Sequence, residues 1–393
     1  MDKKNNLLIL SLTFSPDNVS TAQIMAGLSE DLLLQGNNVK VITTTPHFNR
    51  DLSMEEKQPL NWLLWPFLKK STLNGVTAYH IPMPRKSIWP PLRMLSWIWF
   101  HAVSVFVALF IGRINTIIAC SPPLTIGLAA WAIAKLKRAK YIYNVQELYP
   151  DIAVNLGKMK GKSIIRFFEK VERFIYRHAL YVTSITEGMC KKIRERTNPE
   201  KVKLIPNYVE IDEDHIPLNI PHEKFTLCYA GNMGVPQYLE VMVDVAKLRP
   251  DVRVLFVGEG QDKDRLKKLA HELTNVEFRD YIPLSEMPKL YAESDLFYVG
   301  QDPLASSDGI PSKIYRILGQ RKPLAVVTAK GSDLEKFVID SKGGIAVNSA
   351  EELAQAITDK ETFAQMGIDG FDYVKTRYAK QVITNQYASL VGE

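Results

Sequence analysis

Cysteine is scarce in this sequence, and its scarcity limits the kind of protein the chain can be. The 393 residues include only Cys120, Cys190 and Cys228, an odd number at wide spacing. This usage is typical of a reducing compartment and argues against a disulfide framework or a zinc site. The opening residues, MDKKNNLLILSL, lack the long apolar core and the cleavage site of a signal peptide. We therefore expect a cytoplasmic protein.

Several familiar motifs are also missing. No GxxxxGK[ST] loop is present, which argues against a P-loop phosphotransferase, and no GxGxxG opens the first strand–helix turn, which argues against dinucleotide redox chemistry. Without a basic recognition helix or zinc-finger spacing, nucleic acid is not an expected partner. The pairs Asp212/Asp214 and Asp262/Asp264 lie in a linker and at a helix start. We therefore expect no metal site.

Charge is divided unevenly along the chain. Residues 1–206 carry 28 Lys and Arg against 14 Asp and Glu, whereas residues 207–393 carry 21 against 29. Opposite signs in the two halves suggest two domains with different partners. The basic half favours an anionic partner, such as a membrane surface or a phosphorylated substrate.

Apolar runs alternate with helical patterns in both halves. Strand, helix and strand patterns follow one another from LLILSLTF (7–14) onward, and the scheme restarts at KFTLCYAG (224–231) after a polar, acidic linker at 207–223. Such alternation predicts βαβ units and mostly parallel sheets. The sequence therefore predicts an α/β fold of two tandem doubly wound, Rossmann-like domains facing a cleft. Ligands of such sheets bind beyond the carboxyl ends of the strands.

Five of the six tryptophans fall between residues 62 and 99, among lysines and arginines. Trp beside Lys and Arg is typical of a membrane–water interface. The alternative is a surface loop whose aromatic side chains pack on the domain. The residues predicted to face an anionic membrane are Trp62, Trp65, Lys69, Lys70, Arg85, Lys86, Trp89 and Arg93.

The 19 uncharged residues 94–112 are long enough to cross a bilayer. Crossing would put the first two strands on the opposite side from the rest of their sheet. We therefore expect a buried or half-immersed helix, with His101 a packed core histidine.

Glycines end two strands of the second half, in YAGNMG (229–234) and VGEG (257–260), and GIPSK (309–313) begins a later helix. Glycine at a strand end permits either close approach to a ligand or a tight turn without one. A lysine in the first turn is unusual, because cations are disfavoured beside the positive end of the helix dipole. We therefore interpret Lys313 as a clamp for a diphosphate, helped by the amides of 312–315 and the Ser312 hydroxyl.

Two loops of the first half are candidates for contacting a second substrate. NVQELYPD (144–151) puts Glu147 and Asp151 after a strand, where carboxylates contact hydroxyl groups, act as a base or cap the next helix. FSPDNVST (14–21) follows the first strand. Its acceptor-side candidates are Ser15, Asp17 and Asn18.

The order of these motifs resembles the family-4 glycosyltransferases, of GT-B architecture, over nearly the whole chain. The stretches that carry the resemblance include FSPDNVSTAQIMAGLSEDLLLQG, LYVTSITEGMCKKIRERTNPEKVKLIPNYVE, YAGNMGVPQYLEVMVDVAKL and GIPSKIYRILGQRKPLAVV. CSPPLTIGLAAWAIAKLK and NVQELYPD resemble the branch that builds bacterial surface polysaccharides on lipid carriers.

The resemblance implies a domain plan and a reaction. Residues 1–206 would bind acceptor and membrane, 207–370 would bind the donor, and a helix in 371–393 would pack back on the first domain. The enzyme would move a hexosyl or N-acetylhexosaminyl group, with retention and without a cofactor or essential metal, from a nucleoside-diphosphate sugar, preferably a UDP-sugar. The acceptor would be a polyprenyl-diphosphate-linked sugar at the inner face of the plasma membrane.

The resemblance also assigns site residues. The family usually has two glutamates with seven residues between them, and the corresponding positions here hold Asp308, which would face the sugar, and Arg316. The predicted catalytic residues are Glu147, Asp151 and Asp308. The predicted donor-binding residues are Gly231, Asn232, Gly258, Glu259, Gly309, Ile310, Ser312, Lys313 and Arg316. Two alternatives remain: a nucleotide-sugar epimerase of the same fold, and a non-catalytic sugar- or lipid-binding protein.

Overall fold

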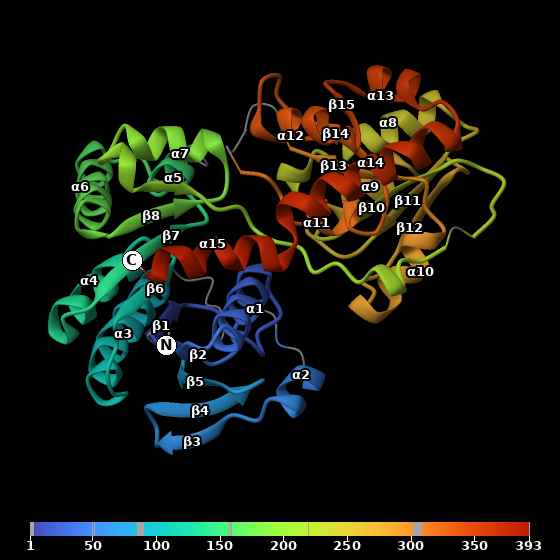
Figure 1. Cartoon of the computed structure of the whole chain (residues 1–393). Helices are drawn as coiled ribbons and strands as arrows, with labels where there is room; N and C mark the ends of the chain where they lie inside the picture. The colour runs from blue at the N-terminus through green and yellow to red at the C-terminus, as the bar shows by residue number, and fades with distance from the viewer. Residues whose placement is uncertain are drawn as a thin grey trace. The chain divides into compact units, whose positions relative to one another are not determined.

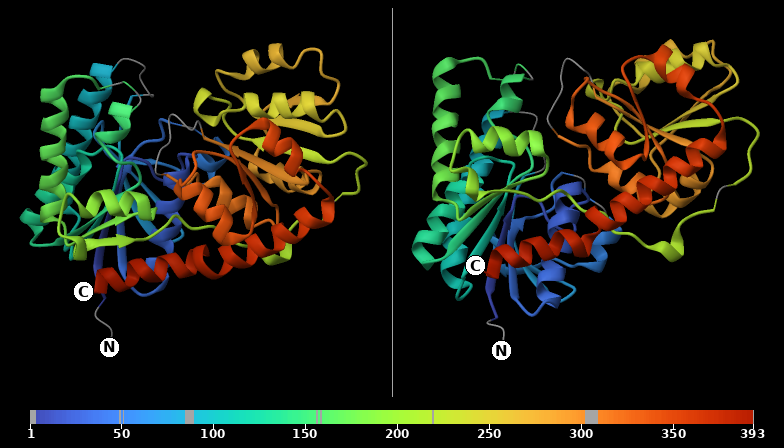
Figure 2. Two further views of the ribbon diagram at one scale, coloured as in Figure 1. Left: turned by 90° about the horizontal axis from the view of Figure 1, so that it is seen from above. Right: turned by 45° about the horizontal axis from the view of Figure 1, so that its top comes forward.

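The computed structural model describes residues 4–48, 50, 52–84, 90–155, 157, 159–218, 220–301 and 309–392. The chain forms two compact units, Met1–Asn207 with Lys380–Glu393, and Tyr208–Ala379. Each unit is built on one sheet with helices on both faces, which confirms the predicted α/β class (Figures 1 and 2).

The first unit contains a nine-stranded sheet in the order β3-β4-β5-β2-β1-β6-β7-β8-β9. The strands from β5 onward pair in parallel, and the β3–β4 and β4–β5 pairs are antiparallel. The strands are β1 (Asn6–Ser11), β2 (Asn38–Thr44), β3 (Asn61–Leu64), β4 (Leu68–Leu73), β5 (Val76–Ile81), β6 (Thr116–Cys120), β7 (Lys140–Val145), β8 (Tyr181–Ser184) and β9 (Val202–Leu204). The helices are α1 (Ser20–Leu34), α2 (Leu52–Lys57), α3 (Pro90–Phe110), α4 (Ile126–Lys137), α5 (Asp151–Asn155), α6 (Lys162–His178), α7 (Glu187–Arg194) and α15 (Lys380–Gly392).

The central strands of this sheet are apolar because both of their faces are covered. All five residues of β6 are buried, as are the last five of β1. Such continuous burial is typical of parallel strands between two helical layers. This is why short apolar runs located these strands in the sequence.

The edge of the sheet differs from the prediction. Part of the Trp-rich stretch, interpreted as membrane-facing or as a surface loop, forms the antiparallel strands β3 and β4 beside β5. All four residues of β3 are exposed. Because neither face is covered, β3 lacks the alternation of apolar and polar residues that marks a half-buried strand.

The carboxyl-terminal segment is two helices rather than the single helix expected over 371–393. α14 (Lys360–Tyr378) belongs to the second unit, and α15 belongs to the first. Asp31 of α1 holds α15 in place: it accepts a hydrogen bond from Thr384 Oγ1 at 2.8 Å and pairs with Lys380 Nζ at 3.2 Å. The last helix thus completes the first unit.

The second unit contains a six-stranded, wholly parallel sheet in the order β12-β11-β10-β13-β14-β15. The strands are β10 (Thr226–Ala230), β11 (Arg253–Val257), β12 (Val276–Arg279), β13 (Leu296–Gly300), β14 (Leu324–Val327) and β15 (Gly344–Val347). The other helices are α8 (Glu240–Leu248), α9 (Lys263–Leu269), α10 (Met287–Ala292), α11 (Lys313–Leu318), α12 (Asp333–Ser341) and α13 (Ala350–Ala356). The strand order reverses between β10 and β13, so a ligand is expected beyond the carboxyl ends of these two strands.

Candidate functional site

Two glycine loops pack backbone against backbone at the carboxyl ends of β10 and β11. The Gly231 amide donates to the Val257 carbonyl at 3.0 Å, and the Met233 amide donates to the Glu259 carbonyl at 2.7 Å. A Cβ added at Gly258, where φ is +134°, would lie 2.1 Å from the Gly231 carbonyl oxygen. Only glycine fits there, so the two loops form a close-packed floor at the strand ends.

Beside this floor lies a pocket of about 240 Å³ that receives Lys313 and Arg316 from α11. Its other walls are apolar side chains: Tyr281, Ile282, Met287, Tyr291 and Phe297. The pocket therefore joins an apolar cavity to two cationic side chains that stand three residues apart on α11. Sequence analysis missed the apolar walls, although the DYIP stretch after β12 marks the loop that supplies two of them.

Lys313 is the distinctive group in this pocket. Its Nζ lies 4.1 Å from the centroid of the Tyr229 ring. Burial lowers the pKa of this amine from 10.5 to about 7. A poorly solvated lysine gains from an anionic ligand, because the anion restores the charged form. The lysine that was unusual at a helix start thus lies where a phosphate would stabilise it.

The start of α11 differs in detail from the expected diphosphate cradle. Ser312 occupies the N-cap position, but its side chain does not make the capping hydrogen bond. The Ile314 amide already donates to the Pro311 carbonyl at 3.1 Å, so it is not offered to a ligand in this conformation. Among the groups at 312–315 that were predicted to bind a diphosphate, the Lys313 side chain therefore has the strongest support.

The remaining donor-side candidates surround the pocket without all lining it. The Gly309 carbonyl accepts a hydrogen bond from Gln301 Nε2 at 2.9 Å, which ties this segment to the end of β13, and Ile310 packs on the core. The Asn232 carbonyl accepts from the Tyr229 hydroxyl at 2.7 Å. Glu259 is exposed and pairs with Lys263 Nζ at 2.6 Å. Asp308 lies outside the described residues.

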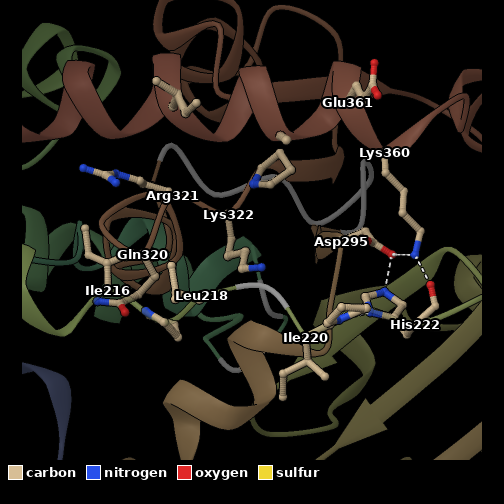
Figure 3. Close-up of a pocket in the computed structure, with 15 residues that line it drawn as sticks. Ile216, Leu218, Ile220, His222, Asp295, Gln320, Arg321, Lys322, Lys360 and Glu361 are labelled. Carbon is tan, nitrogen blue, oxygen red and sulfur yellow. Dashed lines mark hydrogen bonds and ion pairs between the residues drawn. The ribbon is translucent and has the colours of Figure 1, made fainter.

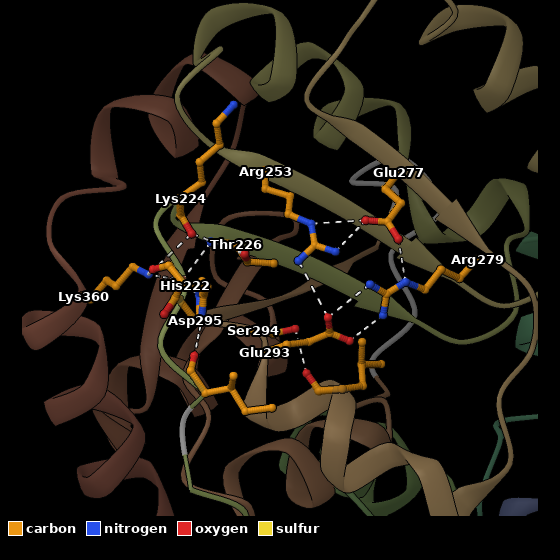
Figure 4. A network of polar contacts seen from close by, with 12 residues as sticks. His222, Lys224, Thr226, Arg253, Glu277, Arg279, Glu293, Ser294, Asp295 and Lys360 are labelled. Carbon is orange, nitrogen blue, oxygen red and sulfur yellow. Dashed lines mark hydrogen bonds and ion pairs between the residues drawn. The ribbon is translucent and has the colours of Figure 1, made fainter.

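A larger cavity of about 500 Å³ lies at the other end of this sheet, where β13 and β14 begin (Figure 3). Asp295 joins the linker to the domain there: it is 2.7 Å from His222 Nε2 and 3.5 Å from Lys360 Nζ. A second network links Arg253 and Arg279 with Glu277 and Glu293 (Figure 4). In both networks opposite charges pair with one another, which indicates a structural role.

In the first unit, the acceptor-side candidates hold the loop after β1. The buried Asp17 carboxylate accepts hydrogen bonds from the amides of His47 and Phe48, both at 3.1 Å. Asn18 Oδ1 accepts from Gln23 Nε2 at 2.7 Å. Asp17 and Asn18 therefore shape this loop through contacts within the unit.

Ser15 begins a buried chain of polar side chains that sequence analysis did not anticipate. Its hydroxyl donates to Gln58 Oε1 at 2.6 Å, and Gln58 Nε2 donates to Ser71 Oγ at 2.8 Å. Ser71 Oγ lies 2.7 Å from His80 Nε2, and His80 Nδ1 lies 3.1 Å from the Thr44 carbonyl. The chain connects the loop after β1 with β4 and β5. Residues so far apart in sequence left no common pattern by which to predict it.

Glu147 and Asp151 follow β7 in different surroundings. Glu147 is half-buried in the loop. Asp151 begins α5 and accepts a hydrogen bond from Arg196 Nη2 at 2.5 Å. Arg196 also pairs with Glu172 at 2.9 Å, and burial raises the pKa of Glu172 to about 7. Asp151 is thus part of an ion-pair cluster, and Glu147 stands in the loop between β7 and α5.

A second polar network that sequence analysis missed lies at the ends of β6, β7 and β8. Asn144 Nδ2 donates to Thr183 Oγ1 at 3.0 Å and to the Tyr387 hydroxyl of α15 at 2.7 Å. Gln146 Nε2 donates to Asn144 Oδ1 at 2.8 Å, and Asn207 Nδ2 donates to Gln146 Oε1 at 2.9 Å. The network fixes the loop that carries Glu147.

The predicted membrane residues that the structure describes are mostly exposed. Trp62 and Trp65 are 47% and 73% exposed. Lys69 Nζ stands 4.6 Å from the Trp62 ring centroid, and the Arg93 guanidinium stands 5.6 Å from that of Trp97. Lys70 is exposed on β4. Arg85, Lys86 and Trp89 lie outside the described residues.

Within the described part of the chain, no three His, Cys, Asp or Glu side chains gather as a group able to hold a metal ion. The cysteines are buried, and burial raises the pKa of the Cys120 and Cys228 thiols.

Comparison with known proteins identifies the two units. Residues 16–208 match the model of the "Glycosyl transferase 4-like domain", and residues 224–360 match that of "Glycosyl transferases group 1". The chain is 27% identical over 373 residues to the "Putative colanic acid biosynthesis glycosyl transferase WcaI" of Escherichia coli (strain K12), covering 89% of this chain and 90% of that protein.

Solved structures share the fold. Anabaena Alr3699/HepE in complex with UDP superposes with a TM-score of 0.69 at 14% identity, and sucrose-phosphate synthase from Thermosynechococcus elongatus with 0.75 at 15%. Each comparison covers 98% of both chains. These neighbours have the GT-B fold of two Rossmann-like domains in tandem.

Proposed function

We propose that this chain, a glycosyltransferase of GT-B fold, transfers a sugar from a nucleoside-diphosphate sugar to a sugar carried on a lipid diphosphate. The product would be an intermediate of bacterial surface polysaccharide synthesis, as the relationship to WcaI suggests. A UDP-sugar is the favoured donor, because the neighbouring Anabaena protein was solved with UDP.

The observation that carries the donor proposal is the half-buried Lys313 beside the glycine floor. Its amine is poorly solvated, with its pKa lowered to about 7, and it shares an apolar pocket with Arg316. A nucleoside diphosphate supplies a planar base that packs against the walls and a diphosphate for the cations. Arg316 replaces an acidic residue usual in the family, so it would contact a phosphate rather than accept hydrogen bonds from a ribose.

The proposed reaction proceeds with retention and without a metal. The bond between the anomeric carbon and the diphosphate oxygen breaks as the acceptor hydroxyl oxygen bonds to the same carbon from the same face. The acceptor proton passes to the leaving diphosphate oxygen. Lys313 and Arg316 stabilise the charge that develops on the diphosphate. Glu147, Asp151 and Asp308 are the carboxylates proposed to orient the acceptor or the sugar.

We also propose that the protein works at the cytoplasmic face of the plasma membrane. Exposed Trp62 and Trp65 provide aromatic side chains for the interface, and Lys69 and Lys70 on β4 and Arg93 on α3 provide cations for anionic lipids. Replacing Trp62 and Trp65 with Ser should release the protein from anionic liposomes. Ile339→Ser, at an exposed apolar residue of the second unit, is the matched control. Equal sedimentation of the double variant and its parent would contradict the membrane role.

The experiment that tests the proposed function is a transfer assay with UDP-sugars and a short-chain lipid-diphosphate sugar, with the product's anomeric configuration read by NMR. Lys313→Ala should lower turnover at least a hundredfold, whereas Lys330→Ala, at an exposed lysine of the same unit, should leave it unchanged. Glu147→Gln and Asp151→Asn, measured in the same assay, show which of the two carboxylates the transfer requires. An inverted product, or a fully active Lys313→Ala, would refute the proposed mechanism.

A further inference from the structure

An apolar groove of about 720 Å³ lies in the first unit between α3 and the antiparallel edge of the sheet. The edge contributes Leu63, Leu64, Phe67, Leu68 and Tyr79 to its walls. Figure 1 shows α3 in the same unit as β3, β4 and β5. The groove lies within the size range of small-molecule sites, about 300–1,000 Å³.

α3 forms the opposite wall because only one of its faces packs on the core. Phe100, Ser104 and Ala108, each four residues from the next, are buried. Phe106 and Phe110 line the groove and remain 56% and 73% exposed. Leu92–Phe110 is long and apolar enough to cross a membrane, yet only 22% of its most apolar 18 residues are buried. Packing within the protein therefore does not account for the apolar character of this helix.

The carboxyl end of α3 is anchored to the rest of the unit. β1 precedes the helix and β6 follows it, and these strands are paired neighbours in one sheet. Lys40 Nζ donates to the Ile111 carbonyl at 2.5 Å, and Lys137 Nζ donates to the Leu109 carbonyl at 2.8 Å. Cations at the carboxyl end of a helix also complement its dipole. The carboxyl end of α3 is thus fixed, and β5 and β6, the strands before and after the helix, belong to one sheet.

Cations stand at the edge of the groove, and its lining residues carry no charge. In a strand, side chains two residues apart point to the same face, so Lys70 shares the face of the groove residue Leu68. Lys70 is also directly opposite Tyr79, another lining residue, in the β4–β5 register. The site therefore combines a long apolar slot with a cation at its rim.

We propose that this groove holds the hydrocarbon chain of the acceptor's lipid carrier, an isoprenoid chain whose phosphate lies toward Lys70. This inference rests on the proposed function and names the part of the acceptor that the first unit binds. A concave groove accommodates a single hydrocarbon chain, whereas the flat surface of a bilayer would contact protruding side chains such as Trp65. A second copy of the protein would bring like charges together at Lys69, Lys70 and Arg93, and the charge pattern therefore favours an anionic lipid.

Isothermal titration of the full chain with farnesyl diphosphate, a water-soluble isoprenoid, tests this site. Ala102, exposed on α3, lines the groove, so Ala102→Trp should fill it and weaken binding at least tenfold. Leu109→Trp adds the same ring outside the groove on the same helix and should stay within twofold of the parent. Lys70→Ala should weaken binding by about threefold to tenfold, and Leu64→Arg, on the facing wall, should repeat the loss seen with Ala102→Trp.

Three other results would contradict the proposed isoprenoid site. Undiminished binding by both groove variants would place the isoprenoid elsewhere. Binding to phosphatidylglycerol vesicles without binding to farnesyl diphosphate would make the surface a bilayer contact. A dimer in solution that Ala102→Trp dissociates would make it a subunit interface. A UDP thermal shift measured on the same samples distinguishes the two proposals. Isoprenoid binding without a UDP shift would contradict the donor site but not the groove. A UDP shift without isoprenoid binding would contradict the groove but not the donor site.

Discussion

Replacing Lys313 with methionine should stabilise the protein while removing donor binding. Burial lowers the pKa of this lysine from 10.5 to about 7. One pKa unit corresponds to about 1.4 kcal/mol, so keeping the charge in the folded chain costs up to about 5 kcal/mol. Solvent screens the half-buried side chain, which reduces the expected effect. We expect Lys313→Met to raise the free energy of unfolding by about 2 kcal/mol at pH 7.

The pH dependence of this gain has a definite sign. Below about pH 7 both the folded and the unfolded parent carry the proton, and the full cost applies. Between about pH 7 and 10.5 only the unfolded chain keeps it, so the parent's stability rises with pH and the advantage of Lys313→Met shrinks. Urea unfolding at pH 6.5, 8 and 9.5 measures this, with Lys330→Met as the exposed control. A variant less stable than its parent, or a gap independent of pH, would refute the reasoning.

Three further changes test the structure around both candidate sites. Gly258→Ala should lower the free energy of unfolding by about 3 kcal/mol, because the added Cβ would lie 2.1 Å from a carbonyl oxygen. Gly331→Ala is the control: its added Cβ would have no atom within 4 Å, and the substitution should cost about 1 kcal/mol in the same urea series. Gln58→Leu should destabilise by about 2 kcal/mol, because it removes buried hydrogen bonds to the Ser15 and Ser71 hydroxyls; a neutral result would show that the polar chain contributes nothing. Burial lowers the pKa of His80 to about 4, so on acidification the unfolded chain takes up a proton before the folded chain does. The free energy of unfolding should therefore fall by about 3 kcal/mol from pH 6.5 to pH 4. His80→Gln should reduce this fall, and an unchanged slope in the variant would contradict the prediction.

The parallel strands could be predicted from the sequence because burial on both faces makes them short apolar runs. β6, which lies between Asn115 and Ser121, is an example, and β10 is followed by Gly231. The antiparallel strand β3 could not be predicted from the sequence, because its four residues are all exposed and show no periodic alternation of apolar and polar residues. The break between α14 and α15 at Ala379 was missed for a similar reason: both segments are helical, and only tertiary contacts such as that of Asp31 with Thr384 separate them.

The donor pocket could be predicted in part. Gly231 and Gly258 end neighbouring parallel strands, whose carboxyl ends necessarily meet at one edge of the sheet. Lys313 was conspicuous because a cation at a helix start opposes the dipole. The walls supplied by Tyr281 and Met287 were not predicted, because they come from a loop and a short helix that carry no repeating pattern.

The most direct test of the central claim, that the pocket at Lys313 binds a nucleoside diphosphate, is a thermal-shift panel. The parent and Lys313→Met would each be heated with UDP, GDP, CDP and ADP, without metal and then with magnesium. Ligand at 100 times its Kd stabilises by about 2.7 kcal/mol, which is a shift of several degrees. We predict such a shift for the parent with UDP, without metal, and none for the variant. No shift with any nucleotide, or equal shifts in both proteins, would contradict the donor site.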